Sequence, residues 1–211
     1  YLSGKQHLDL MISKSCNACT DALLNAVGGP KAVNDWMRSA GITEFQLNRD
    51  IATLVREDGR VDPASAVDFR DSATPRAMGQ LLAGIYQGKW LSASSRGVLM
   101  NAMRATTTGK KRMRSALPTS AGLAHKTGTL ARTASDIGIF HTPDGRAVAV
   151  AIYVTGQSPS MAVENGDRSR KLEARANRDA RISSITQALY HGFGRNVNDG
   201  RNWASAEYGG R

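Results

Sequence analysis

One stretch decides the fold: Gly122-Leu123-Ala124-His125-Lys126-Thr127-Gly128-Thr129. Its apolar first half followed by polar residues indicates a strand that leaves the core and carries reactive groups at one end. Far upstream, Ser15-Cys16-Asn17 places a hydroxyl and an amide in a short polar turn.

The composition is that of an ordinary globular protein. The 211 residues are 41% hydrophobic and 22% charged, enough to bury a core without help from disulfides or metal. The formal net charge of +10 raises the question of nucleic acid or an anionic membrane as partner. The Lys and Arg residues are scattered, however, and are not interleaved with aromatic residues. No apolar run is long enough to span a bilayer, so we predict neither nucleic-acid binding nor stable membrane insertion.

The two cysteines, Cys16 and Cys19, have a Cys-X-X-Cys spacing that suits a metal site or a redox pair. The sequence has no second pair to complete a zinc site, no clustered histidines and no thioredoxin-like strand before the motif. We therefore predict two small structural residues that face their helix, with no metal and no cofactor.

The first half of the sequence favours helices. Apolar periodicity with start and stop signals predicts them over residues 7–13, 20–27, 30–39, 75–88 and 93–105. Thr74 and Ser92 are predicted N-caps, and Val33, Trp36 and Met37 are predicted core residues. Residues 42–73 lack helical periodicity, so we expect a long polar loop there, and such loops are usually functional.

The second half changes character. Residues 123–126, 137–140 and 147–154 are predicted strands of one antiparallel meander, with Pro143-Asp144-Gly145 as a turn. A helix over residues 169–193, stopped by Gly194, should pack on this sheet through Leu172, Ala176, Ile182, Ile185 and Leu189. The predicted fold is α+β, with a helical lobe (1–118), a sheet lobe with its C-terminal helix (119–193) and a flexible tail (194–211).

The order of the motifs resembles that of class A β-lactamases and their penicillin-binding relatives, from about residue 7 to residue 193. The landmarks are Ser15-Cys16-Asn17, Gly28-Gly29-Pro30, Arg70-Asp71-Ser72-Ala73-Thr74-Pro75, Thr107-Thr108-Gly109, Leu117-Pro118, Lys126-Thr127-Gly128-Thr129 and Pro143-Asp144-Gly145. In that family a Ser-X-Asn turn and a Lys-Thr-Gly strand form two active-site walls, and Ser-X-X-Lys supplies the nucleophile. No Ser-X-X-Lys occurs in these 211 residues, so we expect that residue 1 is not the natural start.

The resemblance implies a role for each motif residue. Acyl transfer needs a proton shuttle and donors for an oxyanion. Ser15 would pass a proton to the β-lactam nitrogen, and Lys126 would favour that transfer and attract the substrate carboxylate. The resemblance therefore implies that Ser15 and Lys126 meet in a cleft between the lobes, within hydrogen-bonding reach of each other. Asn17 would bind the amide of the substrate side chain. The strand residues Thr127, Gly128 and Thr129 would line the substrate, with the Thr129 N–H as an oxyanion donor.

Relatives also carry an arginine that anchors the substrate carboxylate. At one common position of this arginine the ungapped alignment has Ser135. An alternative position falls on Arg112, which is our candidate, and Arg132 is a second one.

The sequence departs from the family pattern at two places. Cys16 replaces the aspartate that usually supports the Ser-X-Asn turn, and a thiol is a weaker hydrogen-bonding group. The glutamate that activates the deacylating water falls on Ile51. Glu57 is the alternative base if the loop insertion precedes it, and Asp50 is a weaker candidate.

Three functions follow from the resemblance. The first is hydrolysis of a β-lactam through an acyl-serine, with a role in antibiotic resistance. The second is a D-alanyl-D-alanine peptidase that deacylates slowly and acts on peptidoglycan stem peptides, and the third is an inactive binding homologue. All three imply an exported protein, periplasmic or secreted, without metal or organic cofactor. The nucleophile would come from a missing N-terminal segment or a companion chain.

Overall fold

A three-stranded antiparallel sheet forms the centre of the protein, in a computed structural model that describes residues 1–195. The strands β3 (Ala124–Leu130), β4 (Thr133–His141) and β5 (Ala147–Thr155) lie in the order β3-β4-β5. Lys126 pairs with Ile137, and Ile139 pairs with Ala149. This confirms the predicted meander and the turn between its last two strands.

Gly138 allows β3 and β4 to approach closely in the middle of the sheet. A Cβ atom there would lie 2.7 Å from the Ala124 carbonyl oxygen and 2.8 Å from the His125 Cβ. Any larger residue would therefore push the two strands apart at the position next to Lys126.

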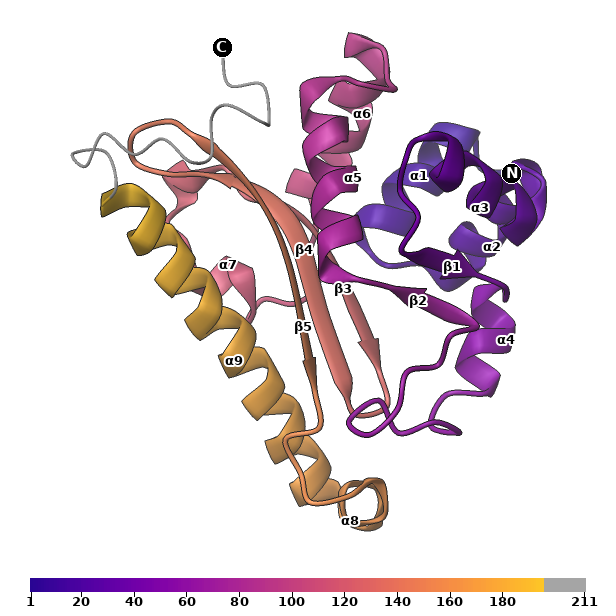
Figure 1. Ribbon diagram of the computed structural model, residues 1–211, viewed down its shortest axis with the longest axis vertical. Coiled ribbons are helices and arrows are strands. Elements are labelled where there is room, and N and C mark those ends of the chain that lie inside the picture. The colour runs from indigo at the N-terminus through magenta and orange to yellow at the C-terminus, as the bar shows by residue number, and fades with distance from the viewer. Residues whose placement is uncertain (196–211) are drawn as a thin grey trace.

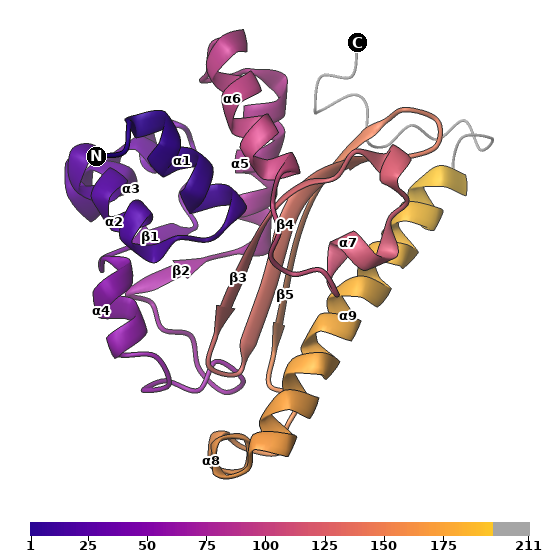
Figure 2. The ribbon, with the colours of Figure 1, turned by 180° about the vertical axis from the view of Figure 1, so that it is seen from behind.

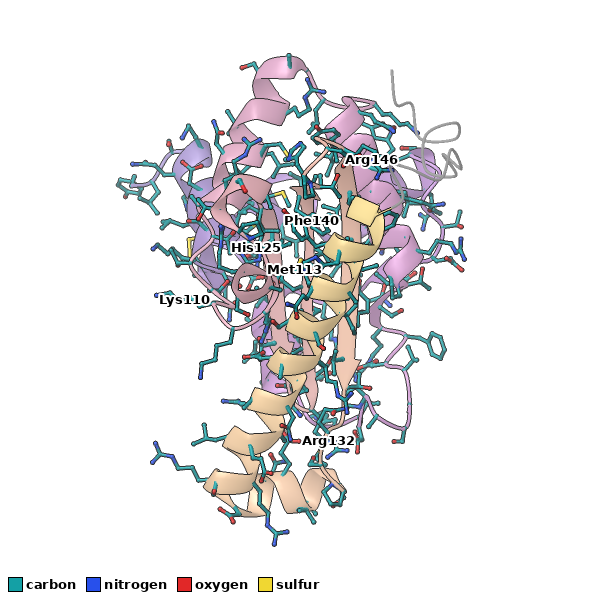
Figure 3. All side chains as sticks on the ribbon, turned by 90° about the vertical axis from the view of Figure 1, so that its left-hand side faces the viewer. Lys110, Met113, His125, Arg132, Phe140 and Arg146 are labelled. Atoms are coloured by element: carbon teal, nitrogen blue, oxygen red, sulfur yellow. A yellow bond between two sulfur atoms is a disulfide. The ribbon has the colours of Figure 1, made fainter. Side chains whose placement is uncertain are left out.

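Helices cover both faces of this sheet (Figures 1 and 2). On one face, α9 (Arg168–Arg195) and the short α7 (Met113–Ala116) enclose a core that includes Phe140 and Ile182. On the other face, α5 (Pro75–Gln87) and α6 (Ala93–Arg104) pack on Ile139. Successive side chains of a strand point to opposite faces, so Ile139 and Phe140 belong to different cores. Figure 3 shows Met113, His125 and Phe140 beside α9, with Arg146 and Arg132 towards opposite ends of the sheet.

Six elements lie beyond α5 (Figure 1): α1 (Gly4–Ser13), α2 (Asn17–Ala26), α3 (Gly29–Ser39), β1 (Phe45–Leu47), α4 (Ile51–Arg56) and β2 (Asp71–Ala73). The 3-10 turn η1 (Thr119–Ala121) contacts β4, and the short α8 (Met161–Gly166) packs on α9. The predicted caps are confirmed, because Thr74 accepts the Ala77 N–H and Ser92 accepts the Ser95 N–H. Met37 is buried as predicted, whereas Trp36 is exposed and meets Trp90 edge to face.

The predicted loop over residues 42–73 is partly wrong, because this segment contains two strands and a helix. β1 and β2 pair antiparallel at its two ends, with Gln46 opposite Ser72. Each strand has three residues, too few for an alternating pattern to stand out in a sequence. α4 has only six residues, and Asp50 is its N-cap, which accepts the Thr53 N–H at 2.7 Å.

The predicted inward face of α9 is wrong in three places. Leu172 and Ile185 are 54% and 42% exposed and Ala176 is exposed too, whereas the fully buried positions include Arg178 and Thr186 beside Ile182. Arg178 is buried because two of its nitrogens bind Glu164, at 2.6 and 3.1 Å, and one also binds the Gly156 carbonyl. The Thr186 hydroxyl bonds to the Ile182 carbonyl.

The C-terminal end of α9 also differs from the prediction. The helix passes through Gly194 and reaches Arg195. The rest of the predicted tail, residues 196–211, lies outside the described residues. The predicted boundary between a helical lobe and a sheet lobe, at residues 118 and 119, stays a prediction. Helices α5 and α6 of the first lobe share a core with the sheet of the second. Within residues 1–195, no helix has both the length and the apolar character needed to cross a bilayer.

Candidate active site

Ser15 and Lys126 meet, as predicted. The Lys126 ammonium donates a hydrogen bond of 2.8 Å to Ser15 Oγ and a second, of 2.7 Å, to the Thr127 carbonyl. Ser15 lies between α1 and α2 with φ of +55°, a left-handed conformation that is uncommon outside glycine. Such strained residues concentrate at functional sites, where the surrounding structure holds them.

The segment Thr107-Thr108-Gly109 connects the two walls of the site. The Thr107 N–H donates to the Ser13 carbonyl at 3.0 Å, and the hydroxyls of Thr108 and Thr127 lie 2.6 Å apart. The turn that carries Ser15 and the strand that carries Lys126 are therefore held to one segment.

Burial lowers the pKa of Lys126 below its ordinary value of 10.5, Asp136 opposes the shift and Arg112 adds to it. The ammonium therefore gives up its proton more readily than a lysine in water, which suits a proton relay. Behind it, His125 and Asp136 form a fully buried pair, with Nδ1 2.8 Å from the carboxylate. His125 is enclosed in the core there and supports the strand.

Arg112 lies beside Thr129, as a carboxylate anchor would. Its NH2 group donates to the Thr129 hydroxyl at 2.7 Å, and NH1 donates to the carbonyls of Gly128 and Ser135, both at 2.9 Å. On the far side, Nε bonds to Asp179 of α9 at 2.6 Å. The Arg112 guanidinium is buried while Thr129 is exposed, so the Thr129 hydroxyl lies between this positive charge and the solvent.

The other two arginine positions serve different purposes. Arg132, in the turn between β3 and β4, binds Asp62 at 2.9 Å and lies 3.6 Å from Glu164. Ser135 faces Gly128, where an added Cβ would lie 2.5 Å from the Ser135 hydroxyl. Neither side chain is therefore placed to bind the carboxylate.

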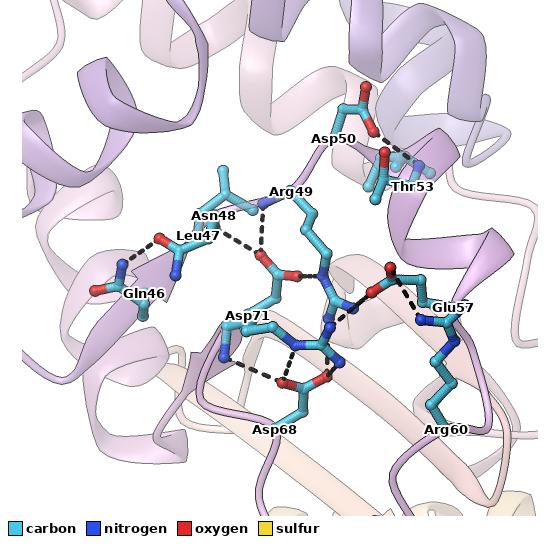
Figure 4. A network of polar contacts seen from close by, with 12 residues as sticks. Gln46, Leu47, Asn48, Arg49, Asp50, Thr53, Glu57, Arg60, Asp68 and Asp71 are labelled. Atoms are coloured by element: carbon cyan, nitrogen blue, oxygen red, sulfur yellow. Dashed lines mark hydrogen bonds and ion pairs between the residues drawn. The ribbon is translucent and has the colours of Figure 1, made fainter.

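An ion-pair network fills the polar loop (Figure 4). Arg49 donates to Glu57 at 2.8 Å, to Asp68 at 2.9 Å and to Asp71. Arg70 binds the same Glu57 and Asp68, each at 2.7 Å. The hydrogen bond from Arg49 lowers the pKa of Glu57, and nearby arginines act in the same direction. Glu57 is thus a weak base whose carboxylate is already bound.

The segment around Ile51, which is predicted to replace the deacylating glutamate, forms the start of α4 and is held by α2. Ile51 is the first residue of α4, and its N–H donates to Asp21 of α2 at 2.7 Å. Asp50 is the N-cap of the same helix, and its hydrogen bond from Thr53 lowers its pKa. Neither residue presents a free carboxylate.

The same loop reaches the sheet through two more aspartates. The Ala131 N–H donates to Asp58 at 2.9 Å, and Asp62 binds Arg132. Every carboxylate of the described residues 48–71 therefore accepts a hydrogen bond from a protein group.

A cavity of about 1150 Å³ separates the loop from the sheet. Glu57 and Phe69 line its loop side, and Lys126, Thr127 and Gly128 line its strand side. Pockets of several hundred Å³ hold drug-sized ligands, so the cavity has room for a small molecule beside the Lys126 ammonium. The part of the chain that the structure describes contains no group of three His, Cys, Asp or Glu side chains that could hold a metal ion.

Cys16 and Cys19 form a disulfide, which the prediction of two small helix-facing residues did not include. Sequence separation alone does not distinguish a bonded pair from two packed thiols. Asn17, between them, is exposed at the first position of α2.

Two partners of the site were missed from the sequence. Asp179 and Asp21 belong to helices that were predicted from their apolar residues alone. Asp179 accepts a hydrogen bond from Arg112 and Asp21 accepts one from Ile51, both distant in the chain.

Comparisons with known proteins agree with this geometry. Extended-spectrum beta-lactamase PER-1 of Pseudomonas aeruginosa is 32% identical over 162 residues, which are 74% of this chain and 50% of that protein. Carbapenem-hydrolyzing beta-lactamase KPC of Klebsiella oxytoca is 34% identical over 145 residues, 67% of this chain and 47% of that one. The crystal structure of a beta-lactamase from Chitinophaga pinensis superposes with a TM-score of 0.74 at 30% identity, covering 91% of this chain and 66% of that chain.

The chain thus spans about half the length of the curated relatives it matches. The family model described as "Beta-lactamase enzyme family" matches residues 1–193, which include Ser15, Lys126, Arg112 and the whole sheet. By this match, with the fold and the meeting of its two motifs, the chain belongs to the β-lactamase enzyme family.

Proposed function

We propose that this chain supplies the proton-relay and carboxylate-binding walls of a serine β-lactamase site, which hydrolyses the β-lactam amide through an acyl-serine. The observation that carries the proposal is the hydrogen bond from Lys126 to Ser15. The 211 residues contain no Ser-X-X-Lys, so the proposal requires a nucleophile from a segment outside this sequence.

The relay follows from the direction of that hydrogen bond. Lys126 donates to Ser15 Oγ, which leaves the Ser15 hydrogen free to point at the ring nitrogen. When the carbon–nitrogen bond breaks, Ser15 gives this hydrogen to the nitrogen, and the ammonium stabilises the negative charge left on Oγ. The lowered pKa of Lys126 favours return of a proton to Ser15 afterwards.

The substrate carboxylate would bind at the Thr129 hydroxyl, between the guanidinium of Arg112 and the ammonium of Lys126. β3 is one of the two outer strands of the described three-stranded sheet, and an outer strand leaves alternate N–H groups outside the ladder. We assign the Thr129 N–H to the oxyanion and the exposed Asn17 amide to the substrate side chain. The substrate class is small β-lactams.

Deacylation should be slow. The carboxylates of the polar loop are bound by protein donors, and Ile51 replaces the glutamate at the expected position. A positioned general base commonly contributes a factor of roughly 100 to 10,000 in rate. Without one, the acyl-enzyme would accumulate, and Glu57→Gln would change its lifetime little.

We also propose an exported protein that works in the periplasm or outside the cell. The Cys16–Cys19 disulfide supports this, because disulfides persist in oxidising compartments and are rare in the cytosol.

The proposal is tested by binding and by turnover. Benzylpenicillin is titrated into the ¹⁵N-labelled chain, and we expect shifts at the amides of residues 126–130. Arg112→Ala should weaken binding roughly 10- to 100-fold, the worth of a charge-assisted hydrogen bond, whereas the distant Arg146→Ala should bind like the wild type. Hydrolysis is then followed with the complete gene product. Equal binding by Arg112→Ala, or perturbation of residues remote from β3, would contradict the site assignment.

A further inference from the structure

The disulfide lies inside the Ser-X-Asn turn, between the residues that the site uses. Cys16 is flanked by Ser15 and Asn17, and it is joined to Cys19 in the first turn of α2. Cys16 is half-buried, whereas Cys19 is 6% exposed. Cys16 is therefore the more accessible of the two cysteines to a reagent in solution.

The helix beginning at this point favours a thiolate on Cys16. Cys16 is the N-cap of α2, and its Sγ accepts the Cys19 N–H at 3.1 Å. Backbone N–H groups and the dipole at a helix N-terminus stabilise negative charge, and they lower the pKa of thiols in Cys-X-X-Cys motifs. Cys16 is thus the better leaving thiolate and the more reactive one after reduction.

We propose that Cys16 and Cys19 form a reversible thiol–disulfide exchange site, which takes a dithiol as its substrate and whose redox state controls the position of Ser15. A thiolate of the dithiol attacks Cys16 Sγ, the bond to Cys19 breaks, and Cys19 leaves as a thiolate that takes up a proton. The second thiol of the reagent then attacks the reagent sulfur that is bonded to Cys16 in the mixed disulfide, and Cys16 leaves as a thiolate. The reagent becomes a cyclic disulfide, and its two electrons reside in the two cysteine thiols.

The link to Ser15 is short and covalent. Ser15 holds a left-handed conformation immediately before Cys16, and such strain persists only when the surroundings impose it. The Cys16 N–H bonds to the Leu10 carbonyl at 3.2 Å, and its carbonyl accepts the Thr20 hydroxyl at 2.9 Å. Reduction removes the covalent tie to Cys19 and leaves these hydrogen bonds as the local support.

Cys16 occupies the position where the family usually has aspartate. The disulfide thus replaces a set of hydrogen bonds by a bond that a dithiol can open. The effect on acyl transfer rests on the proposed function, whereas the exchange site and the movement of Ser15 do not.

The first arm of the test uses the wild-type chain alone. It is equilibrated in mixtures of reduced and oxidised dithiothreitol, trapped with maleimide and weighed by intact mass spectrometry. We expect one two-electron transition in which both thiols appear together. After reduction, iodoacetamide should modify Cys16 about tenfold or more faster than Cys19, because Cys16 is more exposed and lies at the N-terminus of α2. A pair that stays reduced in oxidised dithiothreitol, or a faster reaction at Cys19, would overturn the proposal.

The second arm follows the amides of Ser15 and Lys126 by NMR in both redox states. We expect them to shift on reduction, to return on reoxidation, and to match the reduced state in Cys16→Ser/Cys19→Ser. Amides at Gly145, in a distant turn, serve as the internal control for unfolding. Unchanged Ser15 and Lys126 signals in a fully reduced chain would refute the coupling. Failure of penicillin to bind either state, with both arms positive, would refute the proposed function and leave the exchange site standing.

Discussion

Gly109 should be among the least replaceable residues near the site. It has φ of +63°, and a Cβ atom there would lie 2.5 Å from Thr127 Cγ2 and 3.3 Å from the Cδ of Arg112. Gly109→Ala therefore meets both a left-handed backbone and a crowded neighbour. The first costs about 1–2 kcal/mol and the second about 1–3 kcal/mol. Alanine also reduces the conformational entropy of the unfolded chain, which offsets about 0.4–1 kcal/mol of this loss of stability.

The free energy of unfolding should fall by about 2–4 kcal/mol in Gly109→Ala, because the backbone and crowding terms outweigh the gain from the unfolded state. For a chain of this size, this corresponds to a Tm lower by roughly 5–15 °C. The measurements are urea denaturation and thermal melts followed by circular dichroism.

Two variants separate the contributions. Gly145 has φ of +84° and no atom within 4 Å of its added Cβ, so Gly145→Ala carries the backbone cost alone, about 1 kcal/mol. Thr127→Ser removes the crowding methyl and keeps the hydroxyl that meets Thr108. In that background, Gly109→Ala should cost about as little as Gly145→Ala. An equal cost of Gly109→Ala in both backgrounds would refute the crowding argument.

Three other outcomes concern charge. Because burial lowers the pKa of Lys126 below 10.5, the unfolded chain binds this proton more tightly, and stability should rise with pH towards 10.5. In Lys126→Met, the free energy of unfolding measured by urea denaturation should rise less between about pH 7 and about pH 10 than in the wild type. An equal rise in both proteins would contradict the burial argument. Arg49 lowers the pKa of Glu57 below 4.5, so the stability that this pair contributes is lost as the pH falls through the lowered value. Arg49→Met should be less stable than the wild type near neutral pH, and its free energy of unfolding should fall less on acidification. A steeper fall than in the wild type would show that other carboxylates dominate. Glu164→Leu leaves Arg178, which is 1% exposed, without its carboxylate and should cost about 3–5 kcal/mol in chemical denaturation; a cost under about 1 kcal/mol would mean that Arg178 escapes to water.

The sheet could be predicted because its signals are local. Alternating apolar residues and the turn at Gly145 define the strands of the meander, and Thr74 and Ser92 mark helix starts within a few residues of the helices they cap. The meeting of Ser15 and Lys126 was predicted from a family resemblance, since no local pattern connects two residues so far apart in the chain.

The errors share a different cause. The inward face of α9 was misplaced because Arg178 is polar yet buried, and its partner Glu164 belongs to another helix. The pairing of Arg112 with Asp179 likewise depends on how α9 crosses the sheet. Such long-range charge pairs follow from tertiary packing, which residue patterns do not contain.

The local sequence was also ambiguous at Cys16 and Cys19. Their spacing suits a metal ligand pair, two packed thiols or a disulfide, and only the position of the turn selects the disulfide.

The central claim is that Ser15, held by Lys126, passes the proton to the leaving nitrogen, and that no carboxylate of the polar loop completes deacylation. The most direct measurement is time-resolved intact mass spectrometry of the complete gene product mixed with benzylpenicillin, in the wild type and in Ser15→Ala. We predict a long-lived adduct in the wild type, formed roughly 100- to 10,000-fold more slowly in Ser15→Ala, with little change in non-covalent affinity. Adduct formation at the same rate in both proteins, or an adduct that vanishes at once in the wild type, would contradict the account.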